Sequence, residues 1–167
     1  MSWRCPDCGM TSAAKAHKAH RHTRFANKYN KIQPVDASWL AAAIDFESSI
    51  GMYRSRNTWI IVLQMGVTDR ELADRMLSII GGGRINHYIP KGEHCNGVWR
   101  YSLNSNGLRV VIPQVFPFII AKKRQFELIL HALELTDTNR GIGHYSSNHD
   151  ELMRVKEELT TLNKRGR

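Results

Sequence analysis

The sequence predicts an α+β fold in which a four-stranded antiparallel sheet carries helices on one face. Strand-like segments occur in two consecutive pairs, each joined by a polar turn, and a helical segment precedes each pair. Strands that follow one another through short turns pair antiparallel, and such a sheet commonly leaves one face free for a partner. We therefore expect the order αββαββα followed by a C-terminal helix.

The first predicted helix begins at Pro34 and ends near Glu47. Asp36 can cap the first turn, and no Pro or Gly interrupts the next eleven residues. Ala41–Ala43 are so small that the backbone of a second helix could approach closely, as in packed membrane helices. The helix dipole disfavours Glu47 at the C-terminal end by roughly 0.3–1 kcal/mol, so we expect a cation close to it.

The first strand pair follows this helix directly. Residues 50–56 and 59–65 are rich in β-branched and aromatic side chains and flank the polar turn Ser55–Asn57. Alternate residues of a strand point to the same face, so Trp59, Ile61 and Leu63 are expected in the core.

A second helix and a second strand pair come next. Thr68–Glu71 is predicted to form a capping box, and Gly81–Gly83 to end the helix. The strands are expected at residues 84–89 and 98–103. The apolar face of this helix is expected to consist of Leu72, Met76, Leu77 and Ile80.

The last part of the chain is predicted to hold two further helices. An apolar segment, residues 108–120, is broken by Pro113 and Pro117 and leads into a helix that starts at Lys122. A final helix starts at Asn148, and its apolar stripe consists of Leu152, Val155, Leu159 and Leu162.

Two segments carry a resemblance to a known family. Residues 39–50 resemble the LAGLIDADG motif of homing endonucleases, with Leu40, Ala41, Ile44, Asp45 and Glu47 on its pattern. The run from Pro117 to Gln125 is similar to a second signature of that family, and the resemblance covers residues 34–163. It implies a saddle-shaped sheet that lies in the DNA major groove. The chain departs from the motif at Ala42, Phe46 and Ser48, and a left-handed backbone at Ser48 would be strained.

The resemblance also implies the chemistry of the site. It assigns Glu47 as the ligand of a catalytic Mg²⁺ (or Mn²⁺), helped by the backbone carbonyl of Phe46. Asp45 is then either a structural or metal-orienting residue or a further ligand. Lys122 is expected to polarise or orient the attacking water, and Gln64 to hydrogen-bond the same solvent or to read a base. Because a single acid cannot hold a pair of metal ions and the motif occurs once, we expect a homodimer on a near-palindromic double-stranded DNA site.

Polar residues on the strands are candidates for reading bases, since Arg, Gln and Asn can make paired contacts to purines. Arg54 and Arg56 cannot share a face with Tyr53, because side chains alternate along a strand. The candidate DNA-binding residues are Tyr53, Arg54, Ser55, Arg56, Asn57, Arg84, Asn86, Tyr88, Arg100 and Ser102.

The first 33 residues form a predicted basic extension, separate from an endonuclease domain at 34–167. They contain seven Lys and Arg residues and one acid, Asp7, a net +6 of the chain's +9. Cys5 and Cys8 form a CxxC knuckle, and His17 and His22 follow with four residues between them. These four side chains suit tetrahedral Zn²⁺, with His20 as the alternative histidine. A disordered basic arm is the other interpretation, and either would bind phosphates in a salt-sensitive manner.

The composition limits the remaining function classes. A pI near 9.8 favours a polyanionic partner. No apolar run reaches the length of a membrane span, and the cysteines do not form a disulfide framework, so we expect an intracellular protein of cytoplasmic, organellar or phage origin. The rival hypotheses are a non-cleaving relative, either a group I intron RNA maturase or a DNA-binding regulator, and a zinc-containing interaction module.

Overall fold

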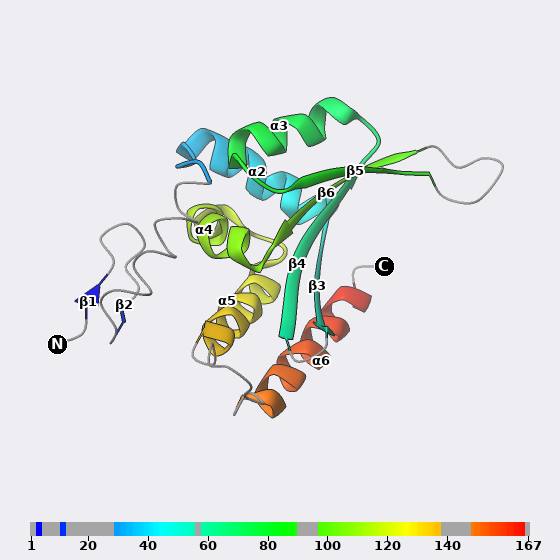
Figure 1. Cartoon of the computed structure of the whole chain (residues 1–167). Helices are drawn as coiled ribbons and strands as arrows, with labels where there is room; N and C mark the ends of the chain where they lie inside the picture. Colours follow the sequence, from blue (N-terminus) through cyan, green and yellow to red (C-terminus); the bar gives the residue numbers. More distant parts are fainter. Residues whose placement is uncertain are drawn as a thin grey trace.

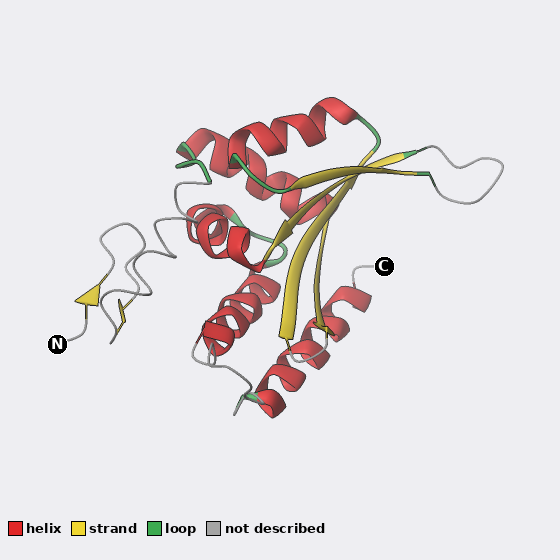
Figure 2. Cartoon of the chain, viewed as in Figure 1, coloured by secondary structure: helices red, strands yellow, loops and turns green. Residues whose placement is uncertain are grey.

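The computed structural model describes residues 3–4, 11–12, 29–55, 58–89, 97–137 and 148–165 (Figure 1). The predicted α+β fold is confirmed: a four-stranded antiparallel sheet carries its helices on one face (Figure 2). In chain order the elements are β1 (Trp3–Arg4), β2 (Thr11–Ser12), α2 (Pro34–Glu47), β3 (Ser48–Ser55), β4 (Thr58–Val67), α3 (Arg70–Ile80), β5 (Arg84–Tyr88), β6 (Val98–Asn104), α4 (Ser105–Val115), the 3₁₀ turn η1 (Phe116–Phe118), α5 (Lys123–Asp137) and α6 (His149–Arg165).

The main sheet has the strand order β3-β4-β6-β5, and all of its neighbouring strands are antiparallel. Burial alternates strictly along β4: the core face carries Trp59, Ile61 and Leu63, as the sequence predicts, and the intervening residues are partly exposed. The face away from the helices, called here the free face, is therefore lined by the residues of opposite parity.

Helix α2 begins at Pro34, whose fixed φ suits the first helical position. Gln33 is the N-cap, and Asp36 lies inside the first turn, where its charge complements the helix dipole, rather than at the cap. The side chains that α2 buries against the sheet and α4 are Ala37, Leu40, Ala41 and Ile44.

Helix α3 differs from its prediction at its start. Asp69, not Thr68, is the N-cap, and its side chain accepts a hydrogen bond from the backbone N–H of Glu71. Leu72, which was expected in the core, is 41% exposed. Ala73 lies in the core instead, beside Met76 and Ile80. Gly81 ends the helix in the left-handed conformation, φ 75°, as predicted.

Helix α4 was not expected as a helix, because prolines interrupt the apolar segment that contains it. Asn104 caps it by accepting a hydrogen bond from the N–H of Gly107, and Pro113 lies within it at an exposed position. An interior proline costs about 3 kcal/mol, whereas each buried aliphatic side chain contributes about 1.5–3 kcal/mol. Burial outweighs the proline here because four aliphatic side chains lie on one face: Leu108, Val111, Ile112 and Val115.

Residues Tyr29–Gln33, which the sequence assigns to the basic extension, pack onto the domain. Tyr29 and Ile32 are each 8% exposed. The Asn30 side chain donates to the carbonyls of Ser78 and Ile79, and its backbone N–H donates to that of Ile80. These contacts supply donors for carbonyls in the last turn of α3, so the chain is attached to the domain from Tyr29 onward.

Helix α6 packs against α5 and β3 through Leu152, Val155 and Leu159. The Asn163 side chain donates to the carbonyl of Ile50 at 2.8 Å, which ties the end of α6 to the strand that follows α2. Among the described helices, none combines the length and the apolar character needed to cross a membrane.

Candidate active site

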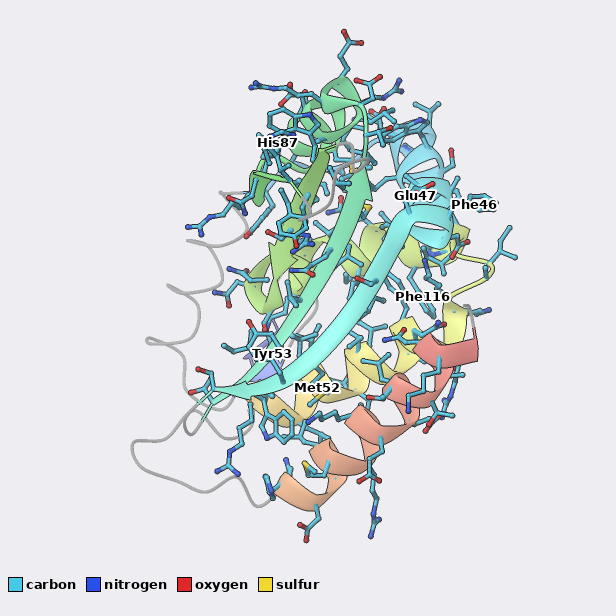
Figure 3. The ribbon with its side chains drawn as sticks, turned by 90° about the vertical axis from the view of Figure 1, so that its right-hand side faces the viewer. Phe46, Glu47, Met52, Tyr53, His87 and Phe116 are labelled. Carbon is cyan, nitrogen blue, oxygen red and sulfur yellow. The ribbon has the colours of Figure 1, made fainter. Side chains whose placement is uncertain are left out.

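Glu47 is the last residue of α2, and β3 begins immediately after it. Its side chain is exposed, and the neighbouring Phe46 is 84% exposed and points away from the ribbon (Figure 3). Ser48, the first residue of β3, has an extended backbone with φ −95°, so the strain considered for this position is absent. The turn from helix to strand therefore presents Glu47 at the surface without a backbone penalty.

Asp45 connects α2 to the segment that precedes α5. Its Oδ2 accepts hydrogen bonds from the N–H groups of Ile120 and Ala121 at 2.8 and 3.1 Å, and its Oδ1 accepts from that of Lys122 at 3.0 Å. A carboxylate at this position complements the positive end of the α5 dipole. Of the roles considered for Asp45, these contacts support the structural one.

Lys122 makes the reciprocal connection. Its ammonium donates to the carbonyls of Ile44 and Ser48 at 2.8 and 2.7 Å, and more weakly to Ser48 Oγ at 3.4 Å. It is the cation expected at the C-terminal end of α2. Burial lowers the pKa of Lys122 below its ordinary value, and the charges of Asp45 and Glu47 partly offset this effect.

Together these contacts form an interlock: Asp45 of α2 binds the backbone just before α5, and Lys122 binds carbonyls at the end of α2. Glu47 lies in the chain between the two groups that the interlock holds, Asp45 and Ser48. Sequence reasoning identified Asp45 and Lys122 but not Ser48, whose backbone carbonyl carries no sequence signal.

The interlock predicts a stability difference between two aspartates of the same helix. Asp45→Ala should lower the free energy of unfolding by about 1–3 kcal/mol, because backbone N–H groups lose their acceptor, and Asp45→Asn should cost less. Asp36→Ala, in the first turn of α2, is the control and should cost about 0.3–1 kcal/mol. Urea denaturation measures these differences. An Asp45→Ala cost no larger than that of Asp36→Ala would contradict the interlock.

Gln64 lies on the free face of β4, directly opposite Ser49 of β3. The same cross-strand row continues to Ser102 of β6 and Arg84 of β5. Ser49 is the second residue after Glu47, so this row connects the surroundings of the carboxylate to the polar side chains of the second strand pair.

The remaining candidate DNA-binding residues lie on different faces of the sheet, because side chains alternate along each strand. Arg54 lies opposite Trp59 on the other face of β3, and Arg56 and Asn57 lie outside the described residues. The Arg100 guanidinium carbon lies 5.2 Å from the ring centroid of Tyr88. The candidates that share the free face are Tyr53, Ser55, Arg84, Asn86, Tyr88, Arg100 and Ser102.

Helix α2 also exposes an apolar stripe. Val35, Ala42 and Phe46 recur at helical spacing, and Val35 and Phe46 are 74% and 84% exposed. Ile120, beside the interlock, is 86% exposed. Large apolar side chains that are this exposed on one helix are characteristic of a protein contact. We refer to Val35, Ala42, Phe46 and Ile120 as the apolar seam.

No group of three or more His, Cys, Asp or Glu side chains gathers within the described part of the chain. Within this part of one chain, Glu47 is therefore not joined by two further side chains of these kinds. The candidate zinc ligands Cys5, Cys8, His17, His20 and His22 lie outside the described residues.

The fold is similar to that of solved homing endonucleases, although no protein-family model and no curated protein matches the sequence. I-CvuI in complex with its target aligns with TM-score 0.60 and 15% identity over 77% of this chain and 82% of that chain. The archaeal intron-encoded I-Vdi141I aligns with TM-score 0.60 and 20% identity over 77% and 84%. The LAGLIDADG meganuclease I-AabMI aligns with TM-score 0.57 and 22% identity over 75% of this chain and 44% of that chain. The chain therefore has the LAGLIDADG homing endonuclease fold.

Proposed function

We propose that this protein is a site-specific DNA endonuclease that uses a divalent metal to break both strands of a long near-palindromic site. The observation that carries the proposal is the exposed carboxylate of Glu47 at the end of a helix with an exposed apolar seam. The fold adds support, since I-CvuI, I-Vdi141I and I-AabMI were all solved with DNA.

Glu47 and the backbone carbonyl of Phe46 would hold Mg²⁺ or Mn²⁺. Both are oxygen donors, which these cations prefer, and the Phe46 carbonyl is among the last four of α2, which have no acceptor role within the helix. When bound, the metal supplies an activated water and stabilisation of the leaving 3′ oxygen.

The chain's own residues would prepare this site. Lys122 would act on the attacking water through its charge, because its three N–H groups already have acceptors on α2 and Ser48. Gln64 would hydrogen-bond the same solvent, and Asp45 would hold the end of α2 in place.

A homodimer would complete the site. One Glu47 per chain is too few acids for a metal pair, and the seam on α2 offers a helix surface for a second copy. A two-fold axis along this seam would bring the two Glu47 carboxylates together. I-AabMI provides a comparison of length, because this chain covers only 44% of it and two copies would cover most of it.

The free face would contact double-stranded DNA. Its Arg, Asn and Gln side chains can pair with base edges in the major groove, and Tyr53 and Ser55 extend the surface toward the end of β3. Arg54, Arg56 and Asn57, at the end of the first hairpin, are proposed to reach phosphates or bases beyond the sheet.

We further propose that the basic extension binds Zn²⁺. Strands β1 and β2 pair antiparallel, Trp3 with Ser12 and Arg4 with Thr11, so they bracket the sequence that contains Cys5 and Cys8. Two cysteines separated by two residues are a common spacing in structural zinc sites.

The zinc proposal predicts about one zinc ion per purified chain by atomic emission spectroscopy. Cys5→Ser and Cys8→Ser should lose it, because a serine hydroxyl is a poor zinc ligand. Cys95→Ser, the third cysteine, is the matched control and should retain it. A metal-free wild-type chain, or equal loss in all three variants, would contradict the proposal.

Cleavage of a DNA site that the protein itself selects, called here a self-selected site, tests the proposed function. The protein is allowed to select duplexes from a randomised library, and a selected duplex is cloned into a plasmid and incubated with Mg²⁺ or with EDTA. Linear plasmid with Mg²⁺ and none with EDTA is expected. Tight binding without cutting would instead favour the maturase or regulator, and intron RNA would be the next ligand to test.

A further inference from the structure

The second strand pair carries an aromatic stack on the face opposite the candidate DNA-binding residues. His87 of β5 and Trp99 of β6 are cross-strand partners, and their rings stack with centroids 4.3 Å apart at an interplanar angle of 27°. The Arg70 guanidinium carbon, from the first residue of α3, lies 4.9 Å from the Trp99 ring centroid. We call these three side chains the hairpin brace.

The surroundings of the brace suit this arrangement. The dipole of α3 disfavours a cation at its first residue, yet Arg70 lies there, paired with the exposed Asp74 at 3.2 Å and with Trp99. A Cβ atom at Gly97 would clash with His87 Nε2, so the absence of a side chain at Gly97 makes room for the His87 ring. Trp99 is also the cross-strand partner of Val67, the last residue of β4. The brace therefore lies where the chain leaves the sheet and enters α3.

The brace and the candidate base readers occupy the two faces of the same strands. Tyr88 and Arg100 follow His87 and Trp99 directly, and Asn86 pairs with Arg100. In the described sheet β5 pairs only with β6, and Figure 1 shows the outer ends of the two strands projecting beyond the helices that cover the rest of the sheet. β4 ends at Val67, opposite Trp99, so beyond this row only β5 and β6 pair, as Tyr88 with Val98. Two paired strands alone are marginally stable, so this end of the hairpin needs support from its other face to hold a fixed direction.

We propose that Arg70, Trp99 and His87 position the projecting end of this hairpin, so that Tyr88, with Asn86 and Arg100 beside it, meets one set of base pairs in a fixed register. We call these base pairs the hairpin base pairs. This inference rests on the proposed DNA-binding function. The brace lies at the same end of the strands as Glu47, because Trp99 pairs with Val67 and Ser48 pairs with Met65, and β4 separates β3 from the strands of the brace (Figure 3). None of the three brace side chains belongs to the candidate active site, so the brace acts on recognition and not on the cutting step.

The test compares the base preferences of variants by selection from a randomised duplex library. Tyr88→Ala identifies the hairpin base pairs as the positions at which its base preference falls. Trp99→Leu should bind the wild-type site about three- to tenfold more weakly and lose preference at these same base pairs. Preference at the other base pairs, and the cutting rate at saturating enzyme, should stay within about twofold of wild type. Trp99→Phe, which keeps a ring for stacking, should restore the preference at the hairpin base pairs. His87→Leu, at an exposed position, should reproduce the loss.

Trp59→Leu is the matched control, because it makes the same change at the far end of β4. Trp59 is 8% exposed, so this variant should lose stability and keep the preference at the hairpin base pairs. Unchanged preference at the hairpin base pairs in both Trp99→Leu and His87→Leu would overturn the inference, as would a loss of preference spread evenly over the site. A wild-type protein that selects no duplex would overturn the proposed function, and the inference with it.

Discussion

Glu47→Gln is expected to reduce DNA cleavage at least about a thousandfold, while DNA binding stays within a few-fold of wild type. Glutamine has nearly the same shape but no negative charge, so it cannot hold a divalent cation against the adjacent Lys122 ammonium. Because Glu47 is exposed, the free energy of unfolding should change by no more than about 0.5 kcal/mol. Strand cleavage on a gel and a mobility-shift titration measure the two effects.

Glu157→Gln is the control for this change, since Glu157 is an exposed glutamate on α6, away from the end of α2. It should cut at the wild-type rate. Comparable cleavage rates for the Glu47 and Glu157 variants would show that Glu47 is not a catalytic residue. A parallel loss of binding and cutting by Glu47→Gln would assign Glu47 to DNA contact instead.

Ala42→Glu is expected to convert the protein to a monomer and to abolish double-strand cleavage. Ala42 is exposed in the single chain and Glu is a good helix former, so the fold should persist with little change in Tm. Across a two-fold seam, however, the substitution places two like charges close together in an apolar contact, which costs several kcal/mol. Analytical ultracentrifugation gives the oligomeric state, and the plasmid assay gives the activity.

Thr160→Glu adds the same charge at an exposed position on α6 and should leave the dimer and its activity intact. It therefore separates the effect of the seam from the general repulsion between an added acid and DNA. A dimeric, fully active Ala42→Glu variant would rule out the seam as the dimer interface.

The sheet could be predicted because its signals are local. Trp59, Ile61 and Leu63 alternate with less buried residues over one strand, and the capping residues and Gly81 mark the ends of α3 within a few positions. The prediction failed where a local rule competed with tertiary packing. Pro113 suggested a break, but the buried face of α4 outweighs the lost hydrogen bond, and Asp69 replaces Thr68 as the cap of α3.

The candidate site divides in the same way. Glu47 and Lys122 could be proposed as site residues because each lies on a short segment that resembles a family signature. The interlock could not, because Asp45 accepts from backbone N–H groups more than seventy residues away, and Lys122 donates to backbone carbonyls at a similar separation. Backbone groups have no sequence identity, so only the packing of α2 against η1 and the segment that follows it reveals these contacts. The hairpin brace could not be predicted either, because His87 and Trp99 become neighbours only in the register in which β5 and β6 pair.

Mapping the cut positions on both strands of a self-selected site tests the central claim most directly, namely that two Glu47 carboxylates related by a two-fold axis cut DNA with a divalent metal. End-labelled strands incubated with Mg²⁺ and wild-type protein should show one cut per strand, placed symmetrically about the centre of the site, and none when EDTA is present. Cutting of a single strand, cuts without symmetry, or a stable complex that is never cut with Mg²⁺ or Mn²⁺ would contradict it.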